Sequence, residues 1–209
     1  MKEDRPSITA QWVAFTRGLG ACLPRSLHLV DDPYGLRFAG GLHALSRVPG
    51  LAPAARRTAR IWLRGPLQMF TVYMQLRTRA IDDDVAAFTR GGGRQIVLLG
   101  AGFDCRAWRI AALAGTTVFE VDHPATQAKK RFVMGTEGPR GHVIFVPWDF
   151  EHEVLADLPA RLERDGFDPR APTMTIIEGV LMYLTTQAID ATFACIASYS
   201  APGSPVAMT

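Results

Sequence analysis

The second half of the chain alternates short apolar runs with longer amphipathic segments, and this alternation is the strongest constraint on its fold. The apolar runs cover residues 96–99, 117–121, 143–146 and 174–177, and the segments between them include RAWRIAAL, PATQAKKRFVM and EVLADLPARLER. Apolar runs of this length are typical of strands buried on both faces, and the intervening segments have helical character. Because parallel strands need a helix-length crossover, the sequence predicts an α/β fold built on a parallel sheet.

The first 90 residues are predicted to be mainly helical. A helix start is expected at Ser7 or Thr9, before the apolar stretch AQWVAF, and the apolar segment around residues 61–76 favours another helix. A loop is expected at DDPYG, residues 31–35, where turn-forming residues gather. The glycine-rich RGGGRQ at residues 90–95 then divides the chain into an N-terminal helical region, 1–90, and a core region, 91–209.

The composition excludes several classes of protein. A chain of 209 residues with 48% hydrophobic and 21% charged residues is typical of one soluble globular domain. The charged start MKEDRPSITA and the lack of any apolar run of about 18 residues predict a cytoplasmic protein without membrane contacts. The three cysteines are scattered and the five histidines lack ligand spacing, so we expect neither a disulfide framework nor a metal site.

The net charge of +3 comes partly from one segment, AARRTARIWLR, in which Arg56, Arg60 and Arg64 recur every four residues. Such a stripe could meet an anionic partner such as a nucleic acid. A solvated helix face opposite Ile61 and Leu63 is the favoured interpretation, because no aromatic-rich RNA-binding motif accompanies the arginines. Nucleic acid is therefore disfavoured as a partner.

A glycine turn follows the first apolar run in QIVLLGAGFDCRAWRI. Gly100 and Gly102 predict a tight turn between a strand and a helix, and such a turn is expected to aim backbone N–H groups at a ligand. A dinucleotide-binding turn would have a third glycine where Cys105 stands, which weakens the hypothesis of an NAD-linked oxidoreductase. The alternative is that the glycines only permit the turn.

Each predicted strand ends close to acidic residues. They are Asp104 after the first, Glu120 and Asp122 at the second, Asp149 after the third and Glu178 after the fourth. Since the ligand crevice of an open α/β sheet lies outside the carboxyl ends of its strands, we expect these acids to converge on one pocket. Taken singly, an acid such as Asp122 before Pro124 could instead cap a helix.

The spacing of these acids suits a nucleoside. Asp122 lies about twenty residues after the glycine turn, where an acid accepts hydrogen bonds from ribose hydroxyls. Asp149 and Phe150 suit an adenine, because a carboxylate accepts from the exocyclic amine while a side chain packs on the ring. An acidic crevice attracts the positive charges of S-adenosylmethionine and repels phosphate. We therefore predict S-adenosyl-L-methionine as the cofactor.

A family resemblance lies in the glycine-turn segment QIVLLGAGFDCRAWRI, in FEVDHPATQAKK, PWDF and IIEGVLMYL, and in the upstream LRTRAIDD. Through these segments the chain resembles the leucine carboxyl methyltransferase family, in particular its bacterial branch of S-adenosylmethionine-dependent O-methyltransferases. The resemblance runs from about Ser7 to the last residue. It implies a Rossmann-like class I methyltransferase fold with an N-terminal helical lid. The family's sheet has seven strands, so strands six and seven are expected to be missing from this sequence. We expect the first four strands in the spatial order third, second, first, fourth, and a fifth beginning at Val206 beside the fourth.

The resemblance also implies roles for individual residues. Arg77 would bind the methionine carboxylate of the cofactor and lie over the end of the first strand. The other implied cofactor-binding residues are Gly100 and Gly102 at the methionine moiety, Asp122 at the ribose, Asp149 and Phe150 at the adenine, and Glu178 near the amino group. Cys105 stands where the family usually has threonine or serine, a small departure.

The implied reaction is O-methylation of a carboxylate or hydroxyl of a small molecule or peptide. A carboxylate acceptor needs no general base, whereas a hydroxyl acceptor would need one, and Tyr183, His123 and Glu178 are candidates. We choose Tyr183 as a substrate-side residue, with simple packing as the alternative. A different function is that of a non-catalytic or split fragment that keeps only the cofactor-binding half and associates through an uncapped sheet edge.

Overall fold

A computed structural model describes residues 6–38 and 65–209 of the chain. At its centre, five parallel strands form one sheet in the order β3-β2-β1-β4-β5. The strands are β1 (Gln95–Leu99), β2 (Thr117–Asp122), β3 (His142–Pro147), β4 (Thr173–Ile177) and β5 (Val206–Met208). The predicted order of the strands and the predicted start of the fifth strand are confirmed, and so is the α/β fold built on a parallel sheet.

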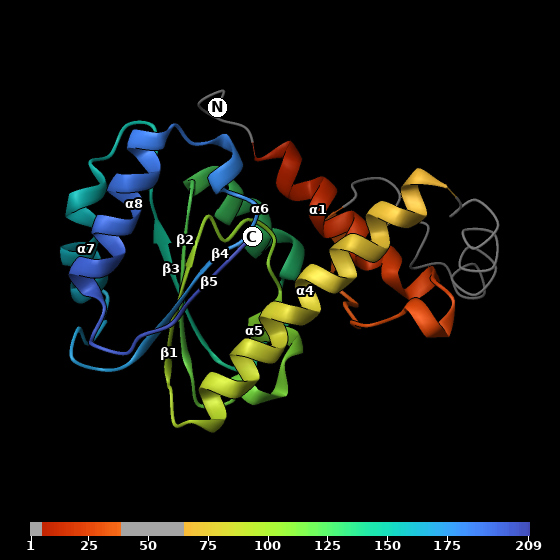
Figure 1. The fold of residues 1–209 in the computed structure, drawn as a ribbon, viewed down its shortest axis with the longest axis horizontal. Coiled ribbons are helices and arrows are strands. Elements are labelled where there is room, and N and C mark those ends of the chain that lie inside the picture. Colours follow the sequence, from red (N-terminus) through yellow and green to blue (C-terminus); the bar gives the residue numbers. More distant parts are fainter. Residues whose placement is uncertain (1–5, 39–64) are drawn as a thin grey trace.

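Helices cover both faces of this sheet (Figure 1), with α7 and α8 on one face and α4, α5 and α6 on the other. Their bounds are α1 (Ile8–Leu19), α4 (Pro66–Arg90), α5 (Arg106–Arg109), α6 (Pro124–Met134), α7 (Leu158–Arg164) and α8 (Thr186–Tyr199). Short 3-10 turns cover Gly20–Cys22, Arg25–Leu27, Gly35–Phe38, Ala111–Leu113, Leu155–Asp157 and Leu181–Tyr183. The segment RAWRIAAL, expected to be one helix, is interrupted at Ile110, which is extended.

Local sequence sets where several helices begin. The side chain of Ser7 caps α1, since its Oγ accepts the N–H of Ala10 at 3.1 Å, as the sequence predicted. Proline is the first residue of α4 and of α6, where its missing N–H costs nothing and its fixed φ favours the helix. The helical segment near residue 76 continues to Arg90, and Gly91 follows as its C-cap.

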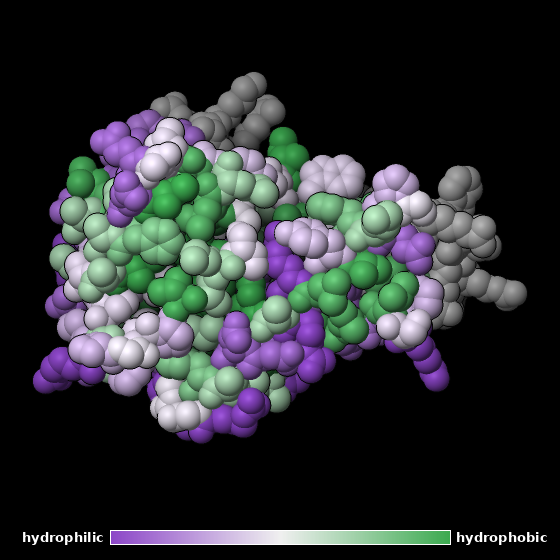
Figure 2. Space-filling model, viewed as in Figure 1, coloured by the Kyte–Doolittle hydropathy of each residue, from purple (hydrophilic) through white to green (hydrophobic). Residues whose placement is uncertain are grey.

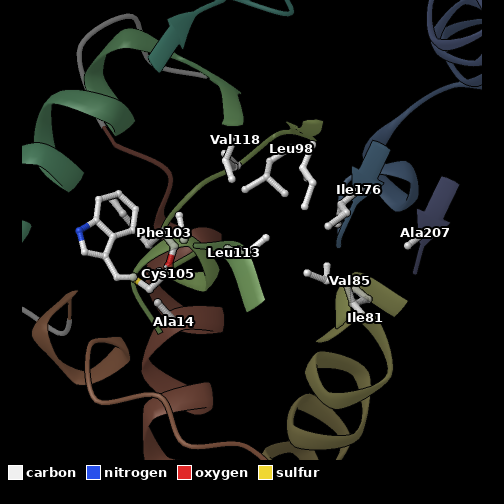
Figure 3. Packing of buried hydrophobic residues seen from close by; sticks show 14 of the residues in the cluster. Ala14, Ile81, Val85, Leu98, Phe103, Cys105, Leu113, Val118, Ile176 and Ala207 are labelled. Carbon is white, nitrogen blue, oxygen red and sulfur yellow. Dashed lines mark hydrogen bonds between the residues drawn. The ribbon is translucent and has the colours of Figure 1, made fainter. Parts of the chain in front are cut away.

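Strand alternation divides the hydrophobic core into two layers. Ile96 and Leu98 of β1 face the layer of α4, whereas Val97 and Leu99 face α7 and α8. Figure 3 shows Leu98 with Ile81 and Val85 of α4, in the layer between the sheet and α4. Because β1 is covered on both faces, all of its residues are buried, as the continuous apolar run predicted.

The N-terminal helices share this core with the sheet, since Ala14 of α1 and Ile81 and Val85 of α4 belong to the same buried cluster as β1. The division into regions 1–90 and 91–209 stays a prediction. The arginine stripe at residues 56–64 lies outside the described residues. Among the described helices, none is long and apolar enough to cross a membrane.

The surface carries two apolar features. Leu67, Met69, Phe70, Tyr73 and Leu76 are exposed on the N-terminal half of α4, and Figure 2 shows hydrophobic residues gathered there. Within the described part of the chain, β5 pairs with β4 alone, so its other edge is open. An open edge of this kind can accept another strand.

Candidate functional site

A cavity of about 600 Å³ opens at the carboxyl ends of the strands. Its walls come from α1, the turn after β1, the end of β2, the segment after β3, and the segment from β4 into α8. The candidate site residues from the sequence that line it are Gly100, Gly102, Asp104, Asp122, His123, Asp149, Phe150, Glu178 and Tyr183. The structure therefore brings together residues that lie up to 83 positions apart in the chain, while their individual roles stay predictions.

The glycine turn folds back onto the end of β2. Gly100 and Gly102 have φ angles of 69° and 51°, which L side chains rarely adopt. The N–H groups of Gly100 and Ala101 donate to the carbonyl of Val121 at 2.9 and 3.1 Å, and the N–H of Gly102 donates to Asp122 Oδ2 at 2.6 Å. The expectation that these groups point at a ligand is wrong, because the neighbouring strand end already supplies their acceptors.

Gly100 also lies against the segment after β4, which makes it sensitive to substitution. A Cβ on Gly100 would come within 2.6 Å of Val180 Cγ2, while a Cβ on Gly115, whose φ is 75°, would meet nothing within 4 Å. Both alanine variants suffer backbone strain of about 1–2 kcal/mol. We expect Gly100→Ala to lower the free energy of unfolding by at least about 1 kcal/mol more than Gly115→Ala, as overpacking does. Urea unfolding measures this, and equal losses would contradict it.

Asp122 is held at the end of β2 by backbone donors. Its Oδ2 accepts the N–H of Gly102, and its Oδ1 accepts the N–H of His123 at 2.7 Å. Burial raises the pKa of Asp122 above its ordinary value, and these two N–H groups oppose the rise. The cap of α6 is His123, whose Nδ1 accepts the N–H of Ala125. The hydroxyl of Thr126 also hydrogen-bonds Asp122, and a carboxylate with about four acceptor sites still keeps acceptor capacity for a ligand hydroxyl.

Asp149 and Phe150 follow β3 at the mouth of the cavity. Asp149 Oδ1 accepts the N–H of Glu151 at 2.9 Å, and its Oδ2 lies 2.9 Å from His152 Nδ1. The hydrogen bond from His152 lowers the pKa of Asp149. The side chain of Phe150 is 44% exposed, so its ring is accessible from the cavity. A carboxylate and an accessible ring therefore lie side by side in the wall.

Glu120 does not join the other acids, which corrects the expectation that it would. It lies two residues before the end of β2, beneath α6, where Lys130 Nζ contacts its Oε2 at 2.6 Å. Both side chains are buried, and burial raises the pKa of Glu120 to about 7 although Lys130 opposes the rise. The pair forms part of the packing between β2 and α6, away from the cavity.

Arg77 reaches the end of β4 instead of the end of β1, where we expected it. Its Nε donates to Glu178 Oε1 at 2.9 Å, and its guanidinium lies about 3.5 Å from the position of a Cβ on Gly179. Arg77 is not among the residues that line the cavity. Its Nη2 is nevertheless buried without a hydrogen-bond partner, a donor that an acidic group could satisfy.

Arg106 is the centre of a buried charge network that the sequence did not predict. Its guanidinium pairs with Asp104, with Asp82 Oδ1 at 2.8 Å and with Glu178 Oε2 at 2.6 Å. Burial alone would raise the pKa values of Asp104 and Glu178, but Arg106 holds both below their usual range. The network ties α4, the segment after β1 and the end of β4 together beneath the cavity.

Arg17 is a further cavity residue that sequence reasoning missed. It belongs to α1, is buried, pairs with Asp32 and donates to the carbonyl of Phe103 at 2.7 Å. The sequence predicted a helix in the segment of Arg17 and a loop at DDPYG, yet no periodic pattern signals an ion pair between residues in two separate segments. Among the described residues, no group of three or more His, Cys, Asp or Glu side chains could hold a metal ion.

A solved structure shares the fold. A DUF574 family protein from Streptomyces avermitilis superposes with a TM-score of 0.55 and 15% sequence identity, covering 99% of this chain and 69% of its own. At this identity the likeness concerns the fold alone.

Similar sequences point to a family. A Mycolicibacterium paratuberculosis protein named "Putative S-adenosyl-L-methionine-dependent methyltransferase" is 37% identical over 186 residues, covering 86% of this chain and 57% of its own length. A Streptomyces coelicolor protein with a name of the same kind is 35% identical over 213 residues, covering 98% of this chain and 66% of its own. The chain thus spans between half and two thirds of the length of these relatives. The model of the leucine carboxyl methyltransferase family matches residues 10–197. The chain belongs to the leucine carboxyl methyltransferase family.

Proposed function

We propose that the protein is an S-adenosyl-L-methionine-dependent methyltransferase that methylates an oxygen of a carboxylate or hydroxyl on a small molecule or peptide. The observation that carries the proposal is the set of carboxylates from separate strand ends, Asp122, Asp149 and Glu178, in the wall of one cavity. A negatively charged wall favours a cationic ligand. Family membership supports the same reaction class.

The residues present fit this cofactor better than a dinucleotide. The N–H groups of residues 100–102 are occupied by acceptors at the end of β2, so they do not form a cradle for a pyrophosphate. Asp122 retains acceptor capacity for ribose hydroxyls, and Phe150 offers a ring beside Asp149. Arg77 does not line the cavity itself, but its buried Nη2 has no partner beside Gly179 of the cavity wall and could donate to a carboxylate there.

The cofactor, when bound, supplies a methyl group on a positively charged sulfur, which is activated toward an oxygen nucleophile. A carboxylate acceptor is ionised at neutral pH, so the chain has only to align it and exclude water, and alignment contributes up to about 7–11 kcal/mol. A hydroxyl acceptor would need its proton removed. Tyr183, which is 64% exposed at the cavity, is our choice as substrate-side residue.

The test is calorimetric titration of the chain with S-adenosylhomocysteine and with NAD, followed by a methyl-transfer screen over carboxylate and hydroxyl acceptors. We expect binding of S-adenosylhomocysteine and transfer to at least one acceptor class. Tighter binding of NAD would reject the methyltransferase proposal.

A second candidate is a non-catalytic or split fragment that binds the cofactor and associates through β5. The open edge of β5 among the described residues favours it. Cofactor binding without transfer, together with a mass above that of one chain in light scattering, would support this candidate over the first.

The prediction for Arg77 follows from its guanidinium. We expect Arg77→Lys to weaken S-adenosylhomocysteine binding by about tenfold, because an ammonium cannot make the Nε contact with Glu178 and present Nη groups at once. Arg79→Lys is the matched control, since Arg79 lies on the same helix in an exposed pair with Asp83. Equal effects of the two substitutions in calorimetry would remove the assignment. The sequence predicts that Arg60→Ala also leaves binding unchanged.

A further inference from the structure

His123 occupies a junction between the two acids assigned to the nucleoside. It follows β2 directly and precedes Pro124, the first residue of α6. Its backbone N–H donates to Asp122 Oδ1 at 2.7 Å, its Nδ1 accepts the N–H of Ala125 at 3.2 Å, and its Nε2 lies 3.5 Å from Asp149 Oδ2. His123 therefore caps α6 and contacts both Asp122, the acid assigned to the ribose, and Asp149, the acid assigned to the adenine.

These contacts define which ring nitrogen carries the proton. Because Nδ1 accepts a hydrogen bond, the proton of the neutral imidazole is on Nε2. That N–H group faces the carboxylate of Asp149, at a distance slightly beyond an ordinary hydrogen bond. The helix cap thus fixes both the tautomer and the orientation of the ring.

The other side-chain contact of Asp149 differs in kind. His152 lies on the same loop, three residues away, and its ring is exposed, so its contact does not connect Asp149 to another element. His123 comes from the end of β2, and its side chain is only 11% exposed. Its ring therefore links the carboxylate of Asp149 to the neighbouring strand end and to Asp122.

We propose that His123 is a positioning residue for adenine recognition, which holds the carboxylate of Asp149 at a set distance from Asp122. The inference rests on the proposed assignment of these acids to adenine and ribose. A carboxylate in that place accepts from the 6-amino group of adenine and repels the 6-oxo group of hypoxanthine. His123 thereby contributes to the choice of the adenine base.

The test compares binding of S-adenosylhomocysteine with that of S-inosylhomocysteine, which carries an oxo group in place of the amino group. In His123→Asn, asparagine still caps α6 but is too short to reach Asp149. We expect the thermal stability of the variant to be unchanged. We expect its preference for S-adenosylhomocysteine over S-inosylhomocysteine to fall by about three- to tenfold, which is the effect of losing one polar contact. If the asparagine variant does not fold, His123→Ser carries the same expectations.

Asp149→Asn separates the inference from the assignment on which it rests. If Asp149→Asn leaves the preference for adenine intact, the assignment of Asp149 fails. If Asp149→Asn abolishes the preference while His123→Asn keeps it, the inference about His123 is wrong and the assignment stands. In the double variant, His123→Asn should cause no further loss of preference, because it acts through Asp149, and an additive loss would also overturn the inference.

Discussion

Asp122→Ala is expected to weaken the binding of S-adenosylhomocysteine by about 2–4 kcal/mol, or about 30- to 900-fold in Kd, since hydrogen bonds to a charged group contribute about 1.5–3 kcal/mol each. The structure adds a second cause. Asp122 also accepts the N–H groups of Gly102 and His123, so its removal leaves two donors of the cavity wall unsatisfied. Isothermal titration calorimetry of the folded variant measures the loss.

Asp83→Ala is the matched control for this experiment. Asp83 is an exposed acid on α4 that pairs with Arg79, and its removal changes the net charge by the same amount. We expect its affinity for S-adenosylhomocysteine to match that of the wild-type chain. An unchanged affinity of a folded Asp122→Ala variant would disprove the ribose assignment.

Arg106→Met is expected to lower the free energy of unfolding by about 3–5 kcal/mol at neutral pH, because it leaves buried carboxylates without their shared cation. Methionine keeps much of the side-chain volume of Arg106, so the lower free energy of unfolding reflects the lost charge rather than a cavity. Asp82 and Glu178 keep their pairs with Arg109 and Arg77, whereas Asp104 loses its direct partner. Urea unfolding of both proteins measures the difference.

The same substitution has a pH dependence of known sign. The folded-state pKa values of Asp104 and Glu178 lie below their ordinary values of 3.8 and 4.5, so their stabilising effect is present above those values and is lost as the pH falls through the lowered ones. The advantage of the wild-type chain over Arg106→Met should therefore shrink below about pH 4. Arg79→Met, on an exposed and solvent-screened pair, should leave the free energy of unfolding almost unchanged at any pH. A constant difference between wild type and Arg106→Met would contradict the charge explanation.

The apolar runs and the polar residues that follow them were sufficient to predict the strands of this protein and the acids at their carboxyl ends. The four apolar runs became strands within a residue of their predicted bounds, because a strand buried on both faces needs a continuous apolar run. The acids after those runs reached one cavity because parallel strands place their carboxyl ends at one edge. The cap of α1 at Ser7 likewise depends on residues three apart in the chain.

Tertiary structure alone decided which polar group meets which. The sequence placed Glu120 and Asp122 together, yet Lys130 of α6 covers the first, while the second reaches the cavity. The N–H groups of the glycine turn donate to Val121 and Asp122 because the turn packs against the end of β2.

The Arg106 network and the contact between His123 and Asp149 join segments that are far apart in the chain. Periodicity describes one element at a time and carries no information on how two elements are oriented when they pack. The sequence by itself therefore determined the strands and the acids that follow them, whereas packing of helices on the sheet determined the partner of each charge.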